Sequence, residues 1–410
     1  MTNGSFDLFG RAPAATAAPS TIAAVQEIVR EAPKGAAIVP WGGGTRQHLG
    51  YAPERYDLAL STQNLGRVVD YQPADMTVTV EAGMTVAALQ TLLGEQGQFL
   101  PLDVAQPELR TVGGIIAARA DSLRRLQYGS VRDSLIGVSV IDARAELIKG
   151  GGRVVKNVSG YDLPKMYCGS LGTLGLIVEA SFKVSPLPQT SATVLLPLEA
   201  EHNSEDVLDS LLASELVPSF LYLLSPQAAR ALLEMPDGVE PSQMLIVGFD
   251  GDEESVAWQV ETLGAGALDA GTAGTIRERL RDFAHAPSPM TCAFHILSSQ
   301  VGAFSRMLEW TARRAGFTAQ VATDAALGMM WAHFLPASET SDWNALWPDL
   351  FDKASRCGGS FIVERMPDEL RVQDKPIWFP LLSDFALMRG LKETLDPGRL
   401  WNPGRFVGQL

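Results

Sequence analysis

The most constraining feature of this sequence is a glycine-rich stretch, residues 150–184, that runs directly into an apolar, strand-like segment. Its seven glycines stand among small polar residues: Gly150, Gly151, Gly152, Gly160, Gly169, Gly172 and Gly175. Glycine tolerates positive φ and lets a backbone come close to a bulky partner, so this density indicates a bent path around a ligand. Tight turns alone would explain only a few of these glycines.

Two segments inside this stretch suggest how a ligand would be held. Residues 159–167 predict a short helix, with Ser159 as its N-cap and Pro164 near its start. Residues 169–175 then lead into the strand expected at Leu176–Val184. Amides freed by such turns, beside Ser and Thr hydroxyls, suit a phosphate or the polar edge of a flat ring.

A second glycine cluster follows the short apolar strand expected at Ala36–Pro40. The residues after Trp41 are Gly42, Gly43, Gly44 and Thr45. Their consecutive amides can face a pyrophosphate, with Arg46 near enough to help neutralise it. A Rossmann GxGxxG loop would need a helix directly after the glycines, and residues 47–53 are not helical. A nicotinamide-binding loop is therefore disfavoured.

Two further segments carry glycines or hydroxyls beside expected elements. Thr111, Gly113 and Gly114 stand at an expected helix start, whose amides either meet phosphate or a ring carbonyl or reflect close helix–strand packing. For this segment alone, packing is slightly favoured. Residues 127–133 precede the strand expected at Leu135–Ile141.

Length, charge and cysteine usage bound the possible functions. A chain of 410 residues fits two domains, and a net charge of −14 argues against nucleic acid and anionic membrane as partners. Cys168, Cys292 and Cys357 are far apart, which favours neither disulfides nor a cysteine-bound metal cluster. The N-terminal sequence lacks a secretory signal pattern and no apolar run reaches membrane-spanning length, so we expect a cytoplasmic protein.

Five motifs in order resemble a known family. They are WGGGT (41–45), TVGGIIAA (111–118), YGSVRDSLIGV (128–138), KNVSGYDLPKMYCGSLGTLGLI (156–177) and LDPGRLWNPGRF (395–406). Together they resemble flavoproteins of the vanillyl-alcohol-oxidase class with a PCMH-type FAD-binding domain. The pairing of KNVSGYD with GSLGTLG resembles, more narrowly, the smaller FAD-binding subunit of bacterial glycolate oxidase.

The resemblance implies a set of cofactor-binding residues. Gly42, Gly43, Gly44 and Thr45 would hold the pyrophosphate, and Thr111, Gly113 and Gly114 would lie along the diphosphate and ribityl chain, with Ser130 and Asp133 nearby. The isoalloxazine and adenine sides would be lined by Gly160, Tyr161, Asp162, Gly169, Ser170, Gly172, Gly175 and Ile177. Asn402 would return from the C-terminal end to close the flavin domain. Substituting Gly44 or Gly172 by Val is expected to weaken FAD binding far more than it disturbs the apo fold.

The predicted FAD is non-covalent. Thr45 stands where covalent members of the class place a flavin-linking His, and no Cys lies near Pro107 to supply a second link.

The expected fold class is α+β. Residues 1–20 are read as a flexible lead-in, and residues 21–186 as a two-subdomain FAD-binding domain that residues 390–410 complete. Alternating strand and helix patterns in residues 187–389 predict a cap with an antiparallel sheet, serving substrate binding or subunit contact. Exposed Trp343, Trp347 and Trp378 would be compatible with such a contact.

No catalytic residue and no metal site is assigned. His295 and His333 are expected to pack in the core rather than act as a base. The HxGDGN-type segment of the larger glycolate oxidase subunit and related 2-hydroxy acid dehydrogenases is missing from the sequence.

Two classes of function stay open. One is a self-sufficient dehydrogenase that moves a hydride from a 2-hydroxy acid to FAD. The other is a FAD-binding subunit for electron relay or assembly in a glycolate oxidase or dehydrogenase complex, beside a larger flavoprotein and an iron–sulfur subunit. The missing segment favours the second class. Contact with the inner membrane, if any, would then run through partner subunits.

Overall fold

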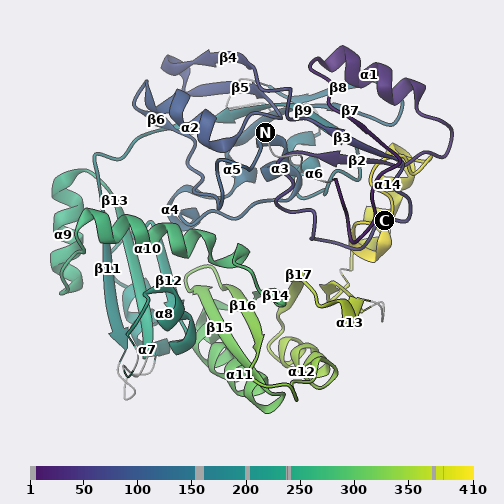
Figure 1. Cartoon of the computed structure of the whole chain (residues 1–410). Coiled ribbons are helices and arrows are strands. Elements are labelled where there is room, and N and C mark those ends of the chain that lie inside the picture. The colour runs from purple at the N-terminus through teal and green to yellow at the C-terminus, as the bar shows by residue number, and fades with distance from the viewer. Residues whose placement is uncertain are drawn as a thin grey trace. The chain divides into compact units, whose positions relative to one another are not determined.

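The structure is a computed structural model that describes residues 6–152, 161–198, 204–236, 238, 242–371, 375–381 and 383–410 (Figure 1). The chain divides into two compact units. The first comprises Met1–Ser122, Gly129–Leu187 and Leu381–Leu410, and the second comprises Leu123–Tyr128 and Pro188–Pro380. The C-terminal return thus begins earlier than the expected residue 390, and a short segment of the expected flavin domain belongs to the second unit.

A small parallel sheet begins the first unit. Its strand order is β1 (Ala15–Ala17), β3 (Leu58–Ser61) and β2 (Ile38–Trp41). Helix α1 (Ile22–Glu31) buries Val25 and Val29 in a cluster with Ile38 and Leu60. Its N-cap is Thr21, whose hydroxyl accepts a hydrogen bond from the N–H of Ala24 at 3.1 Å.

The first described residues of the expected lead-in, segment 6–9, pack against the first unit, whereas most of residues 10–20 are exposed. Leu8 is 2% exposed, and the ring of Phe6 lies 5.2 Å from that of Trp41 in an edge-on arrangement. The Tyr56 hydroxyl donates to the carbonyl of Phe6 at 2.8 Å and accepts from Trp41 Nε1 at 2.7 Å. The apolar residues of segment 6–9 supply this attachment, and the Ala/Pro/Thr-rich composition further along concealed it.

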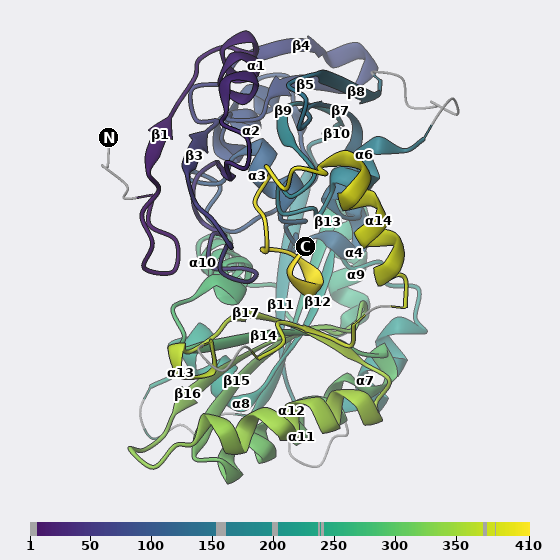
Figure 2. The ribbon, with the colours of Figure 1, turned by 90° about the vertical axis from the view of Figure 1, so that its right-hand side faces the viewer.

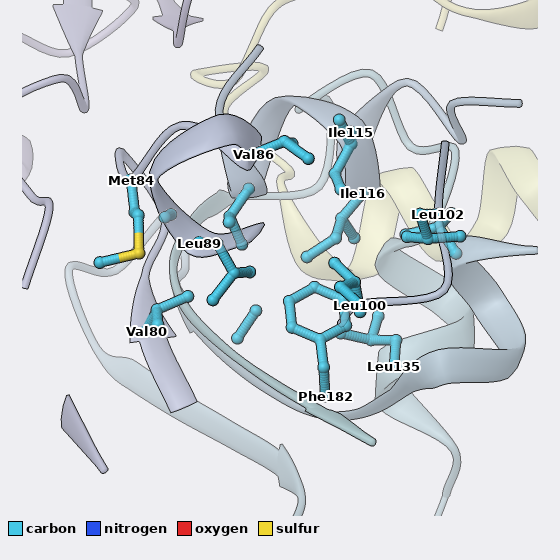
Figure 3. Packing of buried hydrophobic residues seen from close by; sticks show 14 of the residues in the cluster. Val80, Met84, Val86, Leu89, Leu100, Leu102, Ile115, Ile116, Leu135 and Phe182 are labelled. Atoms are coloured by element: carbon cyan, nitrogen blue, oxygen red, sulfur yellow. The ribbon is translucent and has the colours of Figure 1, made fainter. Parts of the chain in front are cut away.

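A five-stranded antiparallel sheet forms the other half of this unit. Its order is β4 (Val68–Gln72), β5 (Thr77–Glu81), β9 (Leu176–Lys183), β7 (Leu135–Ile141) and β8 (Leu147–Gly151). Helices α2 (Val86–Gly94) and α3 (Val112–Ala117) cover it. Figure 3 shows Leu89 of α2 and Ile116 of α3 pointing toward Phe182 in this core.

Shorter elements complete the first unit. They are η1 (Pro73–Asp75), β6 (Gln98–Phe99) paired with β10 (Ser185–Pro186), α5 (Val131–Ser134), α6 (Leu163–Tyr167), α14 (Phe385–Leu395) and η4 (Val407–Gln409). The N-cap of α6 is Asp162, which accepts from the N–H of Lys165 at 3.2 Å. The expected cap, Ser159, lies outside the described residues.

The second unit is built on one antiparallel sheet. Its order is β11 (Thr190–Leu198), β13 (Gln243–Gly251), β12 (Phe220–Leu224), β15 (Phe317–Asp324), β16 (Met329–Pro336), β14 (Met290–His295), β17 (Ser360–Arg365) and β18 (Trp378–Phe379). Its helical elements are α4 (Arg125–Tyr128), α7 (Ser204–Leu212), α8 (Pro226–Leu232), α9 (Glu253–Leu263), α10 (Ala270–Asp282), η2 (Phe283–His285), η3 (Ser298–Gln300), α11 (Val301–Arg314), α12 (Trp343–Arg356) and α13 (Asp368–Arg371). Figure 2 shows α11 and α12 side by side along this sheet. The expected antiparallel sheet backed by helices is confirmed.

The tryptophans proposed as an exposed contact surface are mostly buried. Trp343 and Trp347 are 7% and 5% exposed, and Trp343 lies 4.2 Å from the ring of Phe317. Trp378 is partly buried in edge strand β18. The prediction of exposure is therefore wrong for the first two, because their positions on α12 face the sheet.

Candidate cofactor site

A hollow in the first unit is lined by four separate parts of the chain and by Thr62. Its lining comes from residues 40–47, Thr62, residues 110–111, 113–115 and 117–118, residues 171–172 and 175–177, Asn402 and Arg405. Its cavity volume is about 100 Å³, and all the empty space within it, including space open to solvent, is about 830 Å³. A slot of this kind suits a long ligand that lies partly in the protein and partly at its surface.

The first wall is the glycine loop after β2. In the described part of the chain, no acceptor receives a hydrogen bond from the N–H groups of Gly42, Gly43, Gly44 or Thr45. These four consecutive donors are half-buried and line the hollow, with Arg46 directly after them. Consecutive free amides beside a cation form an anion-binding concavity.

Close packing explains why this loop needs glycine. A Cβ on Gly42 would lie 2.2 Å from Thr111 Oγ1, and one on Gly43 would lie 1.7 Å from the carbonyl oxygen of Leu109. Gly44 has φ +75°, a backbone conformation that glycine favours. The loop is therefore pressed onto residues 109–111.

The second wall is α3, and the N–H groups at its start already donate hydrogen bonds within the protein. Thr111 Oγ1 caps the helix by accepting from the N–H of Gly114 at 3.2 Å. The N–H groups of Val112 and Gly113 donate to the carbonyls of Met84 at 2.8 Å and Ala82 at 2.7 Å. Of the two alternatives for this segment, helix–strand packing is the one that the structure shows. Thr111, Gly113 and Gly114 line the hollow without offering these amides to a ligand.

The third wall is the loop before β9. Gly172 and Gly175 line the hollow together with Ile177 of β9. Gly172 is buried, and its N–H donates to no acceptor in the described residues. Gly169 and Ser170 do not line the hollow. They fix the loop instead, since the N–H of Gly169 donates to the carbonyl of Ile116 at 2.9 Å.

The geometry adds strain in the apo fold to the weaker FAD binding that is expected for Val at Gly44 or Gly172. Gly172 has φ +66°, and a Cβ there would lie 3.0 Å from Pro40 Cγ. At Gly44 a Cβ would lie 3.2 Å from the Trp41 ring. Branched side chains at positive φ would strain the apo chain as well.

The fourth wall comes from the C-terminal segment. Asn402 has φ +46°, and its side-chain Nδ2 donates to the carbonyl of Leu171 at 2.7 Å. Its Oδ1 is buried and accepts no hydrogen bond in the described part of the chain. A buried acceptor without a donor in a lined hollow indicates a ligand with hydroxyl or N–H groups. Free amides and a free acceptor together fit FAD, which carries both phosphate oxygens and such donors.

Sequence reasoning missed two buried arginines in this hollow. Arg110 and Arg405 are 3% and 2% exposed, and both line it. Arg405 Nη2 donates to the carbonyls of Leu49 at 2.7 Å and Gln47 at 3.1 Å. Both arginines could have been found from the sequence, because Arg110 directly precedes the TVGG motif and Arg405 is the last residue of the NPGR motif. Cations at this site suit a diphosphate.

Besides Gly169 and Ser170, four other described residues that were expected to bind the cofactor do not line this hollow. Ser130 and Asp133 form the capping box of α5, with Ser130 Oγ donating to Asp133 Oδ2 at 2.6 Å. Tyr161 is 93% exposed. Asp162 pairs with Lys165 Nζ at 2.5 Å, and the hydrogen bond with Lys165 lowers the pKa of this carboxyl. Gly160 lies outside the described residues.

The second unit offers a buried histidine. His333 is 2% exposed, and its ring nitrogens lie 2.9 Å from Thr291 Oγ1 and 2.7 Å from the carbonyl of Phe283. Burial lowers the pKa of His333. The predicted packing role is confirmed for His333, whereas His295 is exposed at the end of β14.

Two searches gave no candidates among the residues that the structure describes. No group of three or more His, Cys, Asp and Glu side chains there could hold a metal. No helix there has the length and apolar character needed to cross a membrane.

Comparison with known proteins connects the hollow to a cofactor. Residues 13–151 match the family model described as FAD binding domain. The chain is 30% identical over 231 residues to glycolate oxidase subunit GlcD of Bacillus subtilis, covering 56% of this chain and 49% of that protein. It is 34% identical over 152 residues to glycolate oxidase subunit GlcE of Escherichia coli, covering 37% of this chain and 42% of that protein. The matched stretches thus span less than half of each relative.

A solved structure shows the same fold over nearly the whole chain. It is p-cresol methylhydroxylase with substrate bound, with a TM-score of 0.71 and 16% identity, covering 95% of this chain and 88% of that one. The predicted α+β fold and FAD as cofactor are confirmed. The chain therefore carries a FAD-binding domain in residues 13–151 and is similar to glycolate oxidase subunits.

Proposed function

We propose that this chain is a FAD-binding oxidoreductase subunit that passes electrons from a 2-hydroxy acid, with FAD held non-covalently in the hollow of the first unit. The observation that carries the proposal is the row of four N–H groups at Gly42–Thr45 with no acceptor in the described chain. They stand in a hollow that also holds the buried, unpaired Asn402 Oδ1.

Donor and acceptor chemistry suggests which part of FAD each wall would hold. The diphosphate has only acceptor oxygens, so it suits the amides of Gly42–Thr45, with Arg46, Arg110 and Arg405 supplying positive charge. Asn402 Oδ1 can only accept, so it suits a hydroxyl or an N–H of the cofactor. When bound, FAD would supply the hydride acceptor, while these residues bind and orient it.

The lining chemistry supports a non-covalent cofactor. Thr45 stands at the position expected for a linking side chain, and no His or Cys is among the residues that line the described hollow. Apolar groups such as Trp41, Ile115 and Ile177 form the rest of its walls and would exclude water from the ring.

The proposed substrate and partners are inferred from similarity to the relatives and from the lack of a general base among the described lining residues. Both relatives are glycolate oxidase subunits by name, which favours a small 2-hydroxy acid and a multisubunit enzyme. The only ionisable side chains among the described lining residues are arginines. Removal of a hydroxyl proton needs a base, which this lining does not offer. We therefore place the chain beside a larger flavoprotein and an iron–sulfur subunit in the cytoplasm, with any membrane contact made through those partners.

The test is anaerobic stopped-flow absorbance of the FAD-loaded chain mixed with glycolate and with D-lactate. The lone chain should bleach far more slowly than turnover, which runs at about 1–10³ per second, and co-expression with the larger flavoprotein subunit should restore rapid bleaching. Rapid bleaching by the lone chain would identify a self-sufficient dehydrogenase. No bleaching in the complex would leave only an assembly role.

A further inference from the structure

We propose that the buried Lys392–Asp396 pair positions the C-terminal segment, residues 396–405, as one wall of the FAD site, so that docking of this segment and FAD binding are coupled. The inference rests on the proposed function, because it takes the hollow as the place where FAD binds. Lys392 and Asp396 are positioning residues, since neither lines the hollow.

The Lys392 ammonium group donates all three of its hydrogen bonds to groups within the first unit. Lys392 in α14 is 4% exposed, and its Nζ donates to Asp396 Oδ2 at 2.6 Å, to the carbonyl of Thr173 at 2.6 Å and to the carbonyl of Trp401 at 2.9 Å. Three donors are the full capacity of a lysine. One side chain thus joins α14, the third wall of the hollow and the C-terminal segment.

Asp396 holds the same segment from its other side. It is fully buried, and its two carboxylate oxygens accept from the N–H groups of Leu400 and Trp401, each at 2.9 Å. The segment from 396 to 401 is therefore folded around a buried pair of charges. The pKa of Lys392 is lowered, because the effect of burial exceeds the opposing effect of the Asp396 carboxylate.

The next residue along the chain belongs to the hollow. Trp401 is fully buried and is followed by Asn402, whose N–H donates to the carbonyl of Ile38 at 2.9 Å. Asn402 Nδ2 also donates to the carbonyl of Leu171, two residues before Thr173. The Lys392 ammonium and the Asn402 side chain therefore both attach the C-terminal segment to the loop before β9, through the carbonyls of Thr173 and Leu171. We infer that the orientation of Asn402 Oδ1 depends on this attachment. In Figure 2 the yellow C-terminal segment runs back among elements of the first unit.

A role in stability alone does not account for a buried pair. Burying two charges costs desolvation energy, and apolar residues of similar volume often serve a core equally well. Here the ammonium also satisfies two main-chain carbonyls that an apolar side chain would leave without a donor. This arrangement specifies one position for the segment, which a binding wall requires.

The experiment measures FAD affinity in positioning and control variants. Lys392→Met keeps the length of the side chain and removes all three donors, and Asp396→Asn removes the charge. Arg356→Met breaks an exposed pair with Asp352 at the same i,i+4 spacing in the second unit. Val80→Ala lowers the stability of the first unit at a buried core residue that neither lines the hollow nor belongs to the C-terminal segment.

Fluorescence titration with FAD should show at least tenfold weaker binding for Lys392→Met and Asp396→Asn, with a changed visible circular dichroism of the bound flavin. Arg356→Met and Val80→Ala should bind within twofold of wild type. A folded Lys392→Met chain with wild-type affinity and spectrum would overturn the inference. If wild type itself binds no FAD, the proposed function fails instead.

Trypsin digestion of the wild-type chain tests the coupling without any variant. Saturating FAD should slow cleavage after Arg399 and Arg405 at least tenfold relative to cleavage in the second unit, because a docked segment must open before it is cut. Equal cleavage rates with and without bound FAD would also overturn the inference.

Discussion

Replacing Gly43 by Ala adds a single methyl group at the tightest point of the glycine loop. The new Cβ would lie 1.7 Å from the carbonyl oxygen of Leu109 and 2.7 Å from its carbonyl carbon. Both neighbours are backbone atoms, so no side chain can rotate away. The loop must shift by roughly 1.3 Å to reach the 3.0 Å below which Cβ contacts essentially never fall.

Such a shift has two separable costs. Overpacking of this kind destabilises a fold by about 1–3 kcal/mol, and we expect the upper end because backbone resists displacement. Moving the four amides also weakens their bonds to a charged ligand, each of which is worth about 1.5–3 kcal/mol. Loss of one such bond corresponds to at least roughly tenfold weaker FAD binding.

The assay combines FAD titration with thermal unfolding of apo and FAD-loaded protein. FAD at 100 times its dissociation constant adds about 2.7 kcal/mol, so Gly43→Ala should lose more Tm in the loaded state than in the apo state. Gly66→Ala is the control, because a Cβ there meets no atom within 4 Å. If Gly43→Ala binds FAD like wild type, the assignment of this loop is refuted.

Three further outcomes are expected. Acid precipitation should release FAD into the supernatant, and flavin retained in the pellet would contradict a non-covalent site. Thr111→Val and Thr85→Val should each cost about 1 kcal/mol, since both residues cap helices, but only the first should weaken FAD binding. Burial raises the pKa of Glu309 to about 7, above its usual 4.5, so the stabilisation from protonated Glu309 is lost as pH rises from about 4.5 through 7. Glu309→Gln should therefore gain stability relative to wild type across that window, and a constant difference in Tm would contradict this pKa.

Local signals in the sequence were enough to place the glycine loop and the start of α3. The strand, glycines and Thr45 stand consecutively, and the helix start expected at Thr111 is confirmed, with the Thr111 side chain as its N-cap. Such features depend on neighbours within a few residues, so they can be read from the chain alone.

Features that depend on distant residues could not be predicted. Whether the Gly113 amide is free depends on the carbonyl of Ala82, and the role of Lys392 depends on Thr173, which is 219 residues away. The burial of Trp343 depends on Phe317 in a neighbouring strand. In each case the residue could be identified in the sequence, but its partner is determined by tertiary packing.

Hydrogen–deuterium exchange of the wild-type chain, with and without FAD, tests the central claim most directly. Short exchange times separate local contacts from the general stabilisation that any ligand gives. The amides of Gly42–Arg46 and of Gly172 should exchange at least tenfold more slowly with FAD bound, while those of Ser130–Asp133 and Tyr161–Lys165 should not change. Protection at the latter two segments without protection at Gly42–Arg46 would contradict the site described here.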